Sequence, residues 1–456
     1  MPSRVIGIPT SRTANFLRFQ RDPLGFLVDA QPLGEVVSLR TSSMRPTYIV
    51  NSPAFIQEIL VHQEANFRKG RSSSVLRRTI GDGLLTAEHE VHRQQKKYLM
   101  PVFYKERIKA YAQIIREETE RLADKMPMDR PVAMHDLMME LTLGIIARSL
   151  FRTELAEDKA ELAAAVDVTI RKTARTIYSP IIIPFSVPTP GHVQHKKAIR
   201  TLESMIYEAI SKAKSNPEEY AGSMLGLLMD TKDENGAPIS ETEVRDQMMT
   251  MLLAGHETTA NALVWAWHSL EQSPEAEEKL QAEADKMAVL MKDGSASASA
   301  ASGGRLSAYE AYKELAYTKQ VIQETLRLYP PAWAILRESE QPVEMLGERF
   351  SVNSSFLISP YAIHRNEAVF GDALVFRPER FDKGASQWAR FAYFPFGGGA
   401  RGCIGSQFAM LEAGLILGIL ASRFRFRSIP GQGDAVPEPL VSLRIKGGRQ
   451  MIAERR

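Results

Sequence analysis

The chain has 456 residues, of which 44% are hydrophobic and 24% charged, and a net charge of +3. This is the composition of a globular protein, and the small net charge gives no argument for a nucleic-acid partner. A single cysteine excludes an intramolecular disulfide framework and a cysteine-based zinc cluster, so we expect a reducing, cytoplasmic location. The N-terminus lacks a secretory signal pattern, and no apolar run reaches the roughly 18 residues of a membrane span, so we expect no transmembrane segment.

The first half of the sequence predicts two short strands followed by helices. The strands are expected in GEVVSLR and RPTYIVNSP, which have β-forming residues and a turn between them. A helix is expected over AFIQEILV, and another over 104–126, where Ile108 and Ile115 share one face. The apolar, proline-containing stretch 177–188 predicts a buried loop or a short helix pair, with a ligand entrance or a membrane-contacting surface as alternatives.

The second half is organised around one long apolar segment. Residues 247–270 are apolar on nearly every side, which predicts a long buried helix through the middle of the protein. The low-complexity stretch 292–304 predicts a flexible surface loop, and because a helical pattern follows it at once, we expect one domain over 1–456. Strand and turn signals dominate 331–360, and a last helix follows the cysteine. The sequence therefore predicts a mainly α fold with minor β-sheet at its edges.

The only cysteine, Cys403, lies in the glycine-rich segment FPFGGGARGCIG. A lone cysteine is most often an inert, buried residue. Here the glycines let the backbone turn sharply and lie close to a large flat ligand. The helix that begins just after Cys403 favours its thiolate, and Arg401 offers a positive fork for a carboxylate. This set of groups suits a haem, with the sulfur on the iron and Arg401 on a propionate.

The spacing within this segment resembles a known haem-binding signature. Phe396, Gly399, Arg401, Cys403 and Gly405 match the haem-ligand motif of the cytochrome P450 family. The resemblance implies the cytochrome P450 fold, with a long central helix over a haem and small β-sheets at the edge. It also implies a haem b cofactor whose axial metal ligand is the Cys403 thiolate.

A second motif agrees with this resemblance. Glu324 and Arg327 are three residues apart on one helical face, a spacing that by itself predicts only an exposed ion pair. In the family such a pair meets another arginine beneath the haem, and the segment FRPERF supplies Arg380. The resemblance implies a structural Glu324–Arg327–Arg380 core that holds the ligand loop in place.

A third motif is AGHETT, residues 254–259, inside the apolar helix. Because glycine is a poor helix-interior residue and threonine a middling one, tight packing against a neighbouring helix is one explanation. In the other explanation, Ala254 and Gly255 leave room for haem and dioxygen, and the Thr258 hydroxyl bonds a backbone carbonyl and opens a local groove. The resemblance implies an oxygen-activation motif in which Thr258 directs a proton and Glu257 relays protons.

The resemblance also assigns residues around the haem and the substrate. Arg337 matches a propionate-binding arginine, while His92 and Lys96 stand where many family members have Trp and Arg. By family position the pocket includes Leu84, Leu85, Leu253, Ala254, Ala332, Trp333, Ile335, Val441 and Leu443. Such an apolar pocket suits a lipophilic substrate such as a fatty acid, terpenoid or steroid. Arg77 and Arg78 are expected either to pair with a substrate carboxylate or to face water.

The expected function is a haem-thiolate monooxygenase that inserts one oxygen atom from O2 into a C–H bond of its substrate. The chain ends shortly after its last helix, so we expect no fused reductase, and electrons would come from a separate ferredoxin or flavodoxin with its reductase. A basic docking face would draw on Arg93, Lys96, Lys97, Lys105, Arg107 and Lys109. A charge run of this kind is usually only a solvated surface.

Two other functions stay open on the sequence. A haem peroxygenase would use hydrogen peroxide without a redox partner, and the Glu257–Thr258 pair argues against it because that pair serves dioxygen protonation. A non-enzymatic haem sensor or carrier would need no proton relay and would be attached to an output domain. Turnover with a ferredoxin system, compared with turnover on peroxide alone, separates the three functions.

Overall fold

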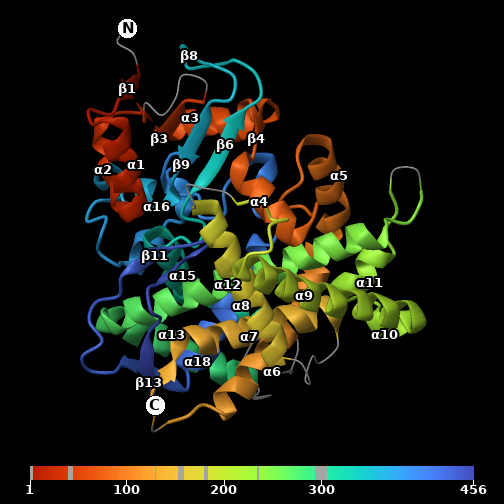
Figure 1. The fold of residues 1–456 in the computed structure, drawn as a ribbon. Coiled ribbons are helices and arrows are strands. Elements are labelled where there is room, and N and C mark those ends of the chain that lie inside the picture. Colours follow the sequence, from red (N-terminus) through yellow and green to blue (C-terminus); the bar gives the residue numbers. More distant parts are fainter. Residues whose placement is uncertain are drawn as a thin grey trace.

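The computed structural model describes residues 4–39, 45–128, 130–152, 159–178, 183–233, 236–292 and 306–456. Over these residues the protein is mainly α, with small sheets beside a bundle of helices (Figure 1). The predicted fold class, mainly α with minor β, is thus confirmed. The loop predicted over 292–304 lies outside the described residues apart from its first position, and 179–182 of the apolar stretch lie outside them too.

The α-helices follow one another along the whole chain. They are α1 (Arg12–Arg21), α2 (Pro23–Asp29), α3 (Pro53–Gln57), α4 (Arg71–Ile80), α5 (His89–Leu99), α6 (Lys105–Asp124), α7 (Met134–Phe151), α8 (Lys159–Tyr178), α9 (Pro190–Ser215), α10 (Pro217–Tyr220), α11 (Met224–Met229), α12 (Glu241–Glu271), α13 (Pro274–Lys292), α14 (Ala308–Lys313), α15 (Ala316–Leu328), α16 (Pro360–Ile363), α17 (Glu367–Phe370) and α18 (Ser406–Ala421). Two further short helices matter below, the π-helix η2 (Glu58–His62) and the 3₁₀ helix η7 (Gly399–Arg401). The predicted helix AFIQEILV is therefore α3 continued as η2.

The longest described helix, α12, crosses the middle of the molecule (Figure 1). At 1.5 Å per residue its 31 residues span about 46 Å. Its start is fixed by a capping box, in which the Ser240 hydroxyl accepts the Glu243 N–H at 3.2 Å and the Glu243 carboxylate accepts the Ser240 N–H at 2.9 Å. Most of its side chains are buried, because α7, α15 and α18 pack around it. The central helix predicted over 247–270 is confirmed.

Within the described residues the strands form four separate sheets. They are β1 (Val5–Gly7), β2 (Val36–Ser38), β3 (Thr47–Val50), β4 (Phe67–Arg68), β5 (Val132–Ala133), β6 (Ile335–Ser339), β7 (Val343–Met345), β8 (Glu348–Phe350), β9 (Ser355–Ile358), β10 (Phe424–Ser428), β11 (Pro437–Pro439), β12 (Leu443–Ile445) and β13 (Gln450–Arg455). The largest sheet has the order β1-β2-β3-β9-β6-β4, and the others are β10-β13-β5, β11-β12 and β7-β8. The two early strands and the strands within 331–360 are thus where the sequence predicted them.

The largest sheet joins strands from the first 68 residues to two strands between 335 and 358, beside the cysteine loop. Its centre is the parallel pair β3–β9, in which Thr47 lies opposite Ser355 and Val50 opposite Ile358. The apolar side chains of this sheet share a buried cluster with Phe391 and Phe394, which directly precede the glycine-rich segment. The sheet therefore supports the loop that carries Cys403.

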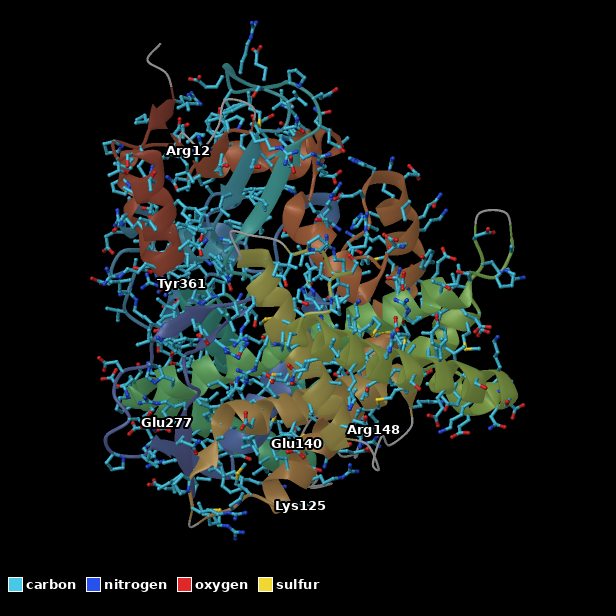
Figure 2. All side chains as sticks on the ribbon, in the orientation of Figure 1. Arg12, Lys125, Glu140, Arg148, Glu277 and Tyr361 are labelled. Carbon is cyan, nitrogen blue, oxygen red and sulfur yellow. The ribbon has the colours of Figure 1, made fainter. Side chains whose placement is uncertain are left out.

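Ion pairs join neighbouring elements of the fold, and Figure 2 labels one member of each of two such pairs, Arg148 and Glu277. Arg148 of α7 pairs with Glu117 of α6 at 2.6 Å, and Glu277 of α13 pairs with Arg427 of β10 at 2.6 Å. The second pair ties the three-stranded sheet to the helices. None of the described helices combines the length and the apolarity that crossing a bilayer requires.

The capping box of α12 leads to a first prediction. Ser240→Ala removes the hydroxyl that accepts the Glu243 N–H, so we expect the free energy of unfolding to fall by about 1 kcal/mol. Urea unfolding followed by circular dichroism measures this change. Ser215→Ala is the control, because this exposed serine bonds only a carbonyl of its own helix and its loss should change stability by less than about 0.5 kcal/mol. Equal stability of the two variants would contradict the capping role.

Candidate active site

The loop that carries Cys403 runs from η7 into α18. At Gly399 the backbone φ is +68°, and a Cβ there would lie 1.8 Å from the carbonyl oxygen of Leu60, so only glycine fits. The Cys403 N–H donates to the carbonyl of Phe396 at 2.9 Å and closes the loop. Gly399 therefore allows the cysteine loop to lie against the backbone of η2.

The environment of the Cys403 thiol is unusual for a free cysteine. Its side chain is exposed, yet the surrounding protein is dense enough that burial raises the pKa of the thiol. The N–H of Gly405 hydrogen-bonds the sulfur and lowers that pKa. The amide at the start of the helix thus acts in the predicted direction, but desolvation outweighs it. A metal cation on the sulfur would reverse the balance, because a coordinating thiol is deprotonated.

The middle of α12 presents small and polar residues on its sides. Ala254 is exposed, between the half-buried Leu253 and Gly255, as expected of a residue that faces a bound group. The Thr258 hydroxyl donates to the Ala254 carbonyl at 3.0 Å, which is the backbone contact predicted for it. Gly255 fits the packing explanation, because a Cβ on it would lie 3.2 Å from the side chain of Ile146. Gly255 therefore permits close packing of α12 on α7.

Glu257 follows Ala254 by three residues on α12 and differs from it in exposure. Its side chain is buried, and burial raises the pKa of the carboxyl to about 7, while a hydrogen bond with Ser442 lowers it. Half-protonation near neutral pH is what a proton-relay group needs. The relay role predicted for Glu257 therefore has suitable acidity, and Ser442 is a partner that the sequence did not indicate.

Several cations gather where the sequence predicted contacts to propionates. Burial, followed by repulsion from Arg401, lowers the pKa of Arg337 to about 10, and its Nε has no hydrogen-bond partner among the described residues. Burial lowers the pKa of His92 to about 3, with further lowering by Lys69, Arg401, Lys96 and Arg337. Burial and then Arg401 lower the pKa of Lys69 to about 7. These groups repel one another, so the cluster suits an anionic ligand.

The individual cations of this cluster are held differently. Arg401 pairs with Glu64 and Glu88 and donates to the carbonyl of Phe67 at 3.2 Å, so its guanidinium is engaged by protein groups. Lys96 donates to the Ala400 carbonyl at 2.6 Å. The contact of Arg401 and Lys96 with a propionate stays a prediction.

Lys69 is a residue that the sequence analysis missed. Its Nζ donates to the carbonyls of Leu84 at 3.0 Å, Leu85 at 2.8 Å and Ala87 at 2.8 Å. In the sequence this residue is only a lysine that follows an arginine. Such a pair is too common to indicate a site. Its neighbours become visible only in the fold.

Glu324, Arg327 and Arg380 meet in the interior, so the exposed-pair interpretation is wrong. The guanidinium of Arg327 donates to both oxygens of Glu324 at 2.8 Å, and the Arg380 Nε lies 3.4 Å from the same carboxylate. The Glu324 and Arg327 side chains are fully buried. Arg327 also donates to the His364 carbonyl at 2.8 Å.

His364 connects this cluster to the cysteine loop. Its Nε2 accepts the N–H of Phe394 at 2.9 Å. Burial, followed by the charge of Arg327, lowers the pKa of His364 to about 3, so the neutral ring keeps a nitrogen that accepts a hydrogen bond. Contacts thus run from Glu324 through Arg327 and His364 to Phe394, and they could hold the cysteine loop in place as predicted.

The predicted pocket residues fall into two groups. Leu85 and Ala332 are exposed, and the side chains of Leu253, Ile335 and Val441 are partly exposed. Leu84, Trp333 and Leu443 are buried, and the last two pack together in a core cluster under the large sheet. A side chain with almost no accessible surface cannot line a pocket, so Trp333 and Leu443 are corrected to core residues that support the pocket segment.

The charged residues suggested for substrate or partner contacts are placed as follows. Arg77 pairs with Asp82 at 2.6 Å and donates to the Thr86 carbonyl at 3.0 Å, whereas Arg78 is exposed. Most of the basic docking residues are exposed on or near α5 and α6, namely Arg93, Lys97, Lys105 and Lys109. The guanidinium of Arg77 is thus bound by groups of the neighbouring residues 82 and 86.

These features together fit a haem. A cysteine sulfur that is exposed but surrounded by protein can serve as an axial ligand, and an exposed alanine interrupts the buried central helix. A buried guanidinium with an unused donor suits a carboxylate of the porphyrin. The donor set matches a thiolate-bound, dicarboxylate macrocycle.

Comparison with known proteins identifies the class. The family described as Cytochrome P450 matches residues 15–450, and the chain therefore belongs to the cytochrome P450 family. It is a haem-thiolate monooxygenase, and Cys403, as the only cysteine, is the residue that can supply the thiolate.

Three of the similar curated proteins come from Streptomyces species. Cyclooctatin synthase of Streptomyces melanosporofaciens is 35% identical over 99% of this chain and 95% of its own length. Cyclooctat-9-en-7-ol 5-monooxygenase of the same organism is 31% identical over 90% of this chain and 86% of its own length. Pentalenene oxygenase of Streptomyces avermitilis is 27% identical over 93% of this chain and 91% of its own length.

A second prediction tests the buried cluster at Glu324. Glu324→Ala leaves two buried guanidiniums without their carboxylate, so the free energy of unfolding should fall by about 3–5 kcal/mol and the purified protein should lose haem absorbance. Arg349→Ala is the matched control, because it removes a 3.1 Å ion pair whose side chains are 89% and 60% exposed. That loss should cost less than about 1 kcal/mol. A stable, haem-loaded Glu324→Ala protein would disprove the anchoring role.

Proposed function

We propose that this cytochrome P450 hydroxylates a terpenoid, and that its substrate is a largely apolar, polycyclic molecule. The observation that carries this proposal is the 35% identity to cyclooctatin synthase over almost the whole chain. The exposed or partly exposed residues of the predicted pocket support it, since Leu85, Leu253, Ala332, Ile335 and Val441 are all apolar. Fatty acids and steroids are the other classes that an apolar pocket admits.

In the proposed site, each group has one task. Cys403 holds the haem, which when bound supplies the activation of dioxygen. Arg337 and His92, with Lys96 and Arg401 beside them, hold the haem carboxylates by charge and hydrogen bonding. Ala254 leaves room on the side facing the haem, and apolar side chains orient the substrate and exclude water.

Thr258 and Glu257 are the proposed proton-handling groups. The Thr258 hydroxyl is held at the Ala254 carbonyl, where it can accept a proton from solvent and pass one on. Glu257, with its pKa near neutral, can take up and release a proton across physiological pH. Glu257 and Thr258 are adjacent on α12, and Thr258 bonds the carbonyl of the exposed Ala254, so the two groups can pass protons toward that position.

The proposal includes the electron source and the setting. Electrons come from a separate ferredoxin or flavodoxin with its reductase, which docks on the basic residues of α5 and α6. The protein acts in the cytoplasm as a single domain over 1–456, with dioxygen as co-substrate. Peroxide-driven turnover is the alternative activity, and it requires neither partner nor relay.

The first experiment is a titration of the ferric holoenzyme with terpenoids, fatty acids and steroids, followed by haem absorbance. A low-to-high-spin shift with cyclic terpenoids alone is the expected result, because a substrate that fills the pocket displaces water from the iron. A shift with fatty acids or steroids instead would overturn the terpenoid assignment. Turnover of the shifting ligand with a ferredoxin system and with peroxide then separates monooxygenase from peroxygenase.

A further prediction concerns Glu257. Glu257→Gln keeps the shape of the side chain but cannot exchange a proton, so product formation with dioxygen should slow by about a hundredfold. In the native protein the rate should fall as pH rises through about 7, because the proton-donating carboxyl is lost, and this dependence should disappear in the variant. Peroxide-driven turnover is the control and should be unaffected. An unchanged dioxygen-driven rate would remove Glu257 from the relay.

A further inference from the structure

The turn between β11 and β12 reaches into the helical core at α12. Ser442 lies in this turn, and its hydroxyl oxygen accepts the Asn261 Nδ2–H at 2.6 Å. Asn261 and Glu257 are four residues apart on α12 and therefore lie on one face of the helix. One serine from the hairpin thus meets two polar side chains of the central helix.

The hydrogen bonds at Ser442 have a defined direction. Because its oxygen accepts from Asn261, the hydroxyl proton is free to be donated to the Glu257 carboxylate, which is the other side chain bonded to it. The three residues are at most 4% exposed. A hydrogen bond sheltered from water in this way is stronger than one at the surface. Asn261 Oδ1 has no partner within the described part of the chain, so Ser442 fixes only one end of that amide.

The turn that carries Ser442 is itself anchored away from α12. Its Leu443 N–H donates to the Pro331 carbonyl at 3.0 Å, and Trp333 Nε1–H donates to the Leu440 carbonyl at 3.0 Å. The segment 331–335 that provides these contacts also contains the exposed Ala332 of the predicted pocket. The turn around Ser442 is therefore held by the pocket segment in addition to the bond that Ser442 makes with α12.

We propose that Ser442 is a positioning residue for proton delivery, whose hydroxyl orients the buried Glu257 carboxyl and connects it to the pocket segment 331–335. The proposal rests on the relay role proposed for Glu257. It adds a residue from another element, so that the orientation of the carboxyl depends on how the hairpin sits against the pocket segment. A substrate that moves Ala332 would thereby also move the proton-handling group.

The direction in which the pKa of Glu257 should shift follows from comparing its bond to Ser442 with the charges around it. Arg444 of β12, and Asp167 and Arg171 of α8, act on the carboxyl, and His135 of α7 shares these three neighbours. Burial raises the pKa of Glu257, and the bond from Ser442 opposes that rise. Loss of the hydroxyl leaves the other charges in place, so the pKa must rise further.

The test is infrared titration of the Glu257 carboxyl in the ferric holoenzyme. The C=O band of the protonated carboxyl is assigned by its absence in Glu257→Gln, and its pH midpoint is compared with that in Ser442→Ala. We expect the midpoint to move upward by about one pH unit, a tenfold change in acid dissociation, since a hydrogen bond to a charged group is lost. Ser442→Thr should restore the midpoint because it keeps the hydroxyl.

A matched control separates this bond from general packing. Ser359→Ala removes another buried hydroxyl, which donates to the Trp333 carbonyl at 2.8 Å in the same pocket segment without contacting Glu257. Its midpoint should equal that of the native protein. An unmoved midpoint in Ser442→Ala, or equal shifts in both variants, would overturn the proposal. If Ser442→Ala does not fold, Asn261→Ala provides the second variant, and it should move the midpoint in the same direction.

A second readout distinguishes the two proposals from each other. The share of electrons recovered in product should fall several-fold in Ser442→Ala, while the substrate concentration for half-maximal spin shift stays the same. Ser442→Ala should cause no further loss when Glu257 is already Gln. If Glu257→Gln leaves the electron yield unchanged but the infrared midpoint still responds to Ser442, the relay role of Glu257 fails and the contact stands. An additional loss in the double variant would refute the positioning role.

Discussion

The buried carboxylate of Glu324 is shared by two arginines, and much of the active site depends on this arrangement. A buried charge without a partner costs several kcal/mol, so each member of the cluster requires the others. Arg327 also donates to the backbone carbonyls of residues 364 and 373. The side chain of residue 364 in turn accepts the N–H of Phe394, at the start of the cysteine loop. Three distant segments are thereby fixed as one unit, and the position of Cys403 relative to α12 follows from it.

The opposite side of the cysteine loop shows an excess of positive charge. Arg401 is neutralised by Glu64 and Glu88, which leaves the other cations of the cluster to act on a ligand. Burial, followed by repulsion from neighbouring cations, lowers the pKa values of His92 and Lys69, and a dicarboxylate cofactor would relieve the repulsive part. Such a ligand would supply the negative charge that these remaining cations lack.

The sequence was sufficient for the residues whose spacing is local. The glycine-rich segment, the pair at 324 and 327 and the long apolar helix are each visible within a few turns of chain, and they predict both the fold class and the cofactor. The sequence alone did not predict contacts between distant segments. The carboxylate partners of Arg401, the lysine at position 69 and the bond between Ser442 and Asn261 arise only when separate elements pack together. The orientation of Gly255 toward α7 also depended on packing, because helical periodicity alone did not reveal which neighbour it would meet.

The parallel pairing of β3 with β9 has a consequence for synthesis of the protein. Residues 47–50 pair with 36–38 along one edge, but along the other edge they find their partner only at 355–358, and Arg401 meets Glu64 across 337 positions of sequence. A ribosome adds roughly 5–20 residues per second, so the N-terminal strands wait many seconds with unsatisfied edges before the sheet closes. Such long-range closure slows folding and exposes strand edges to other chains. Expression yield should therefore respond to chaperones and slow growth, and haem supply matters most after translation has passed residue 403.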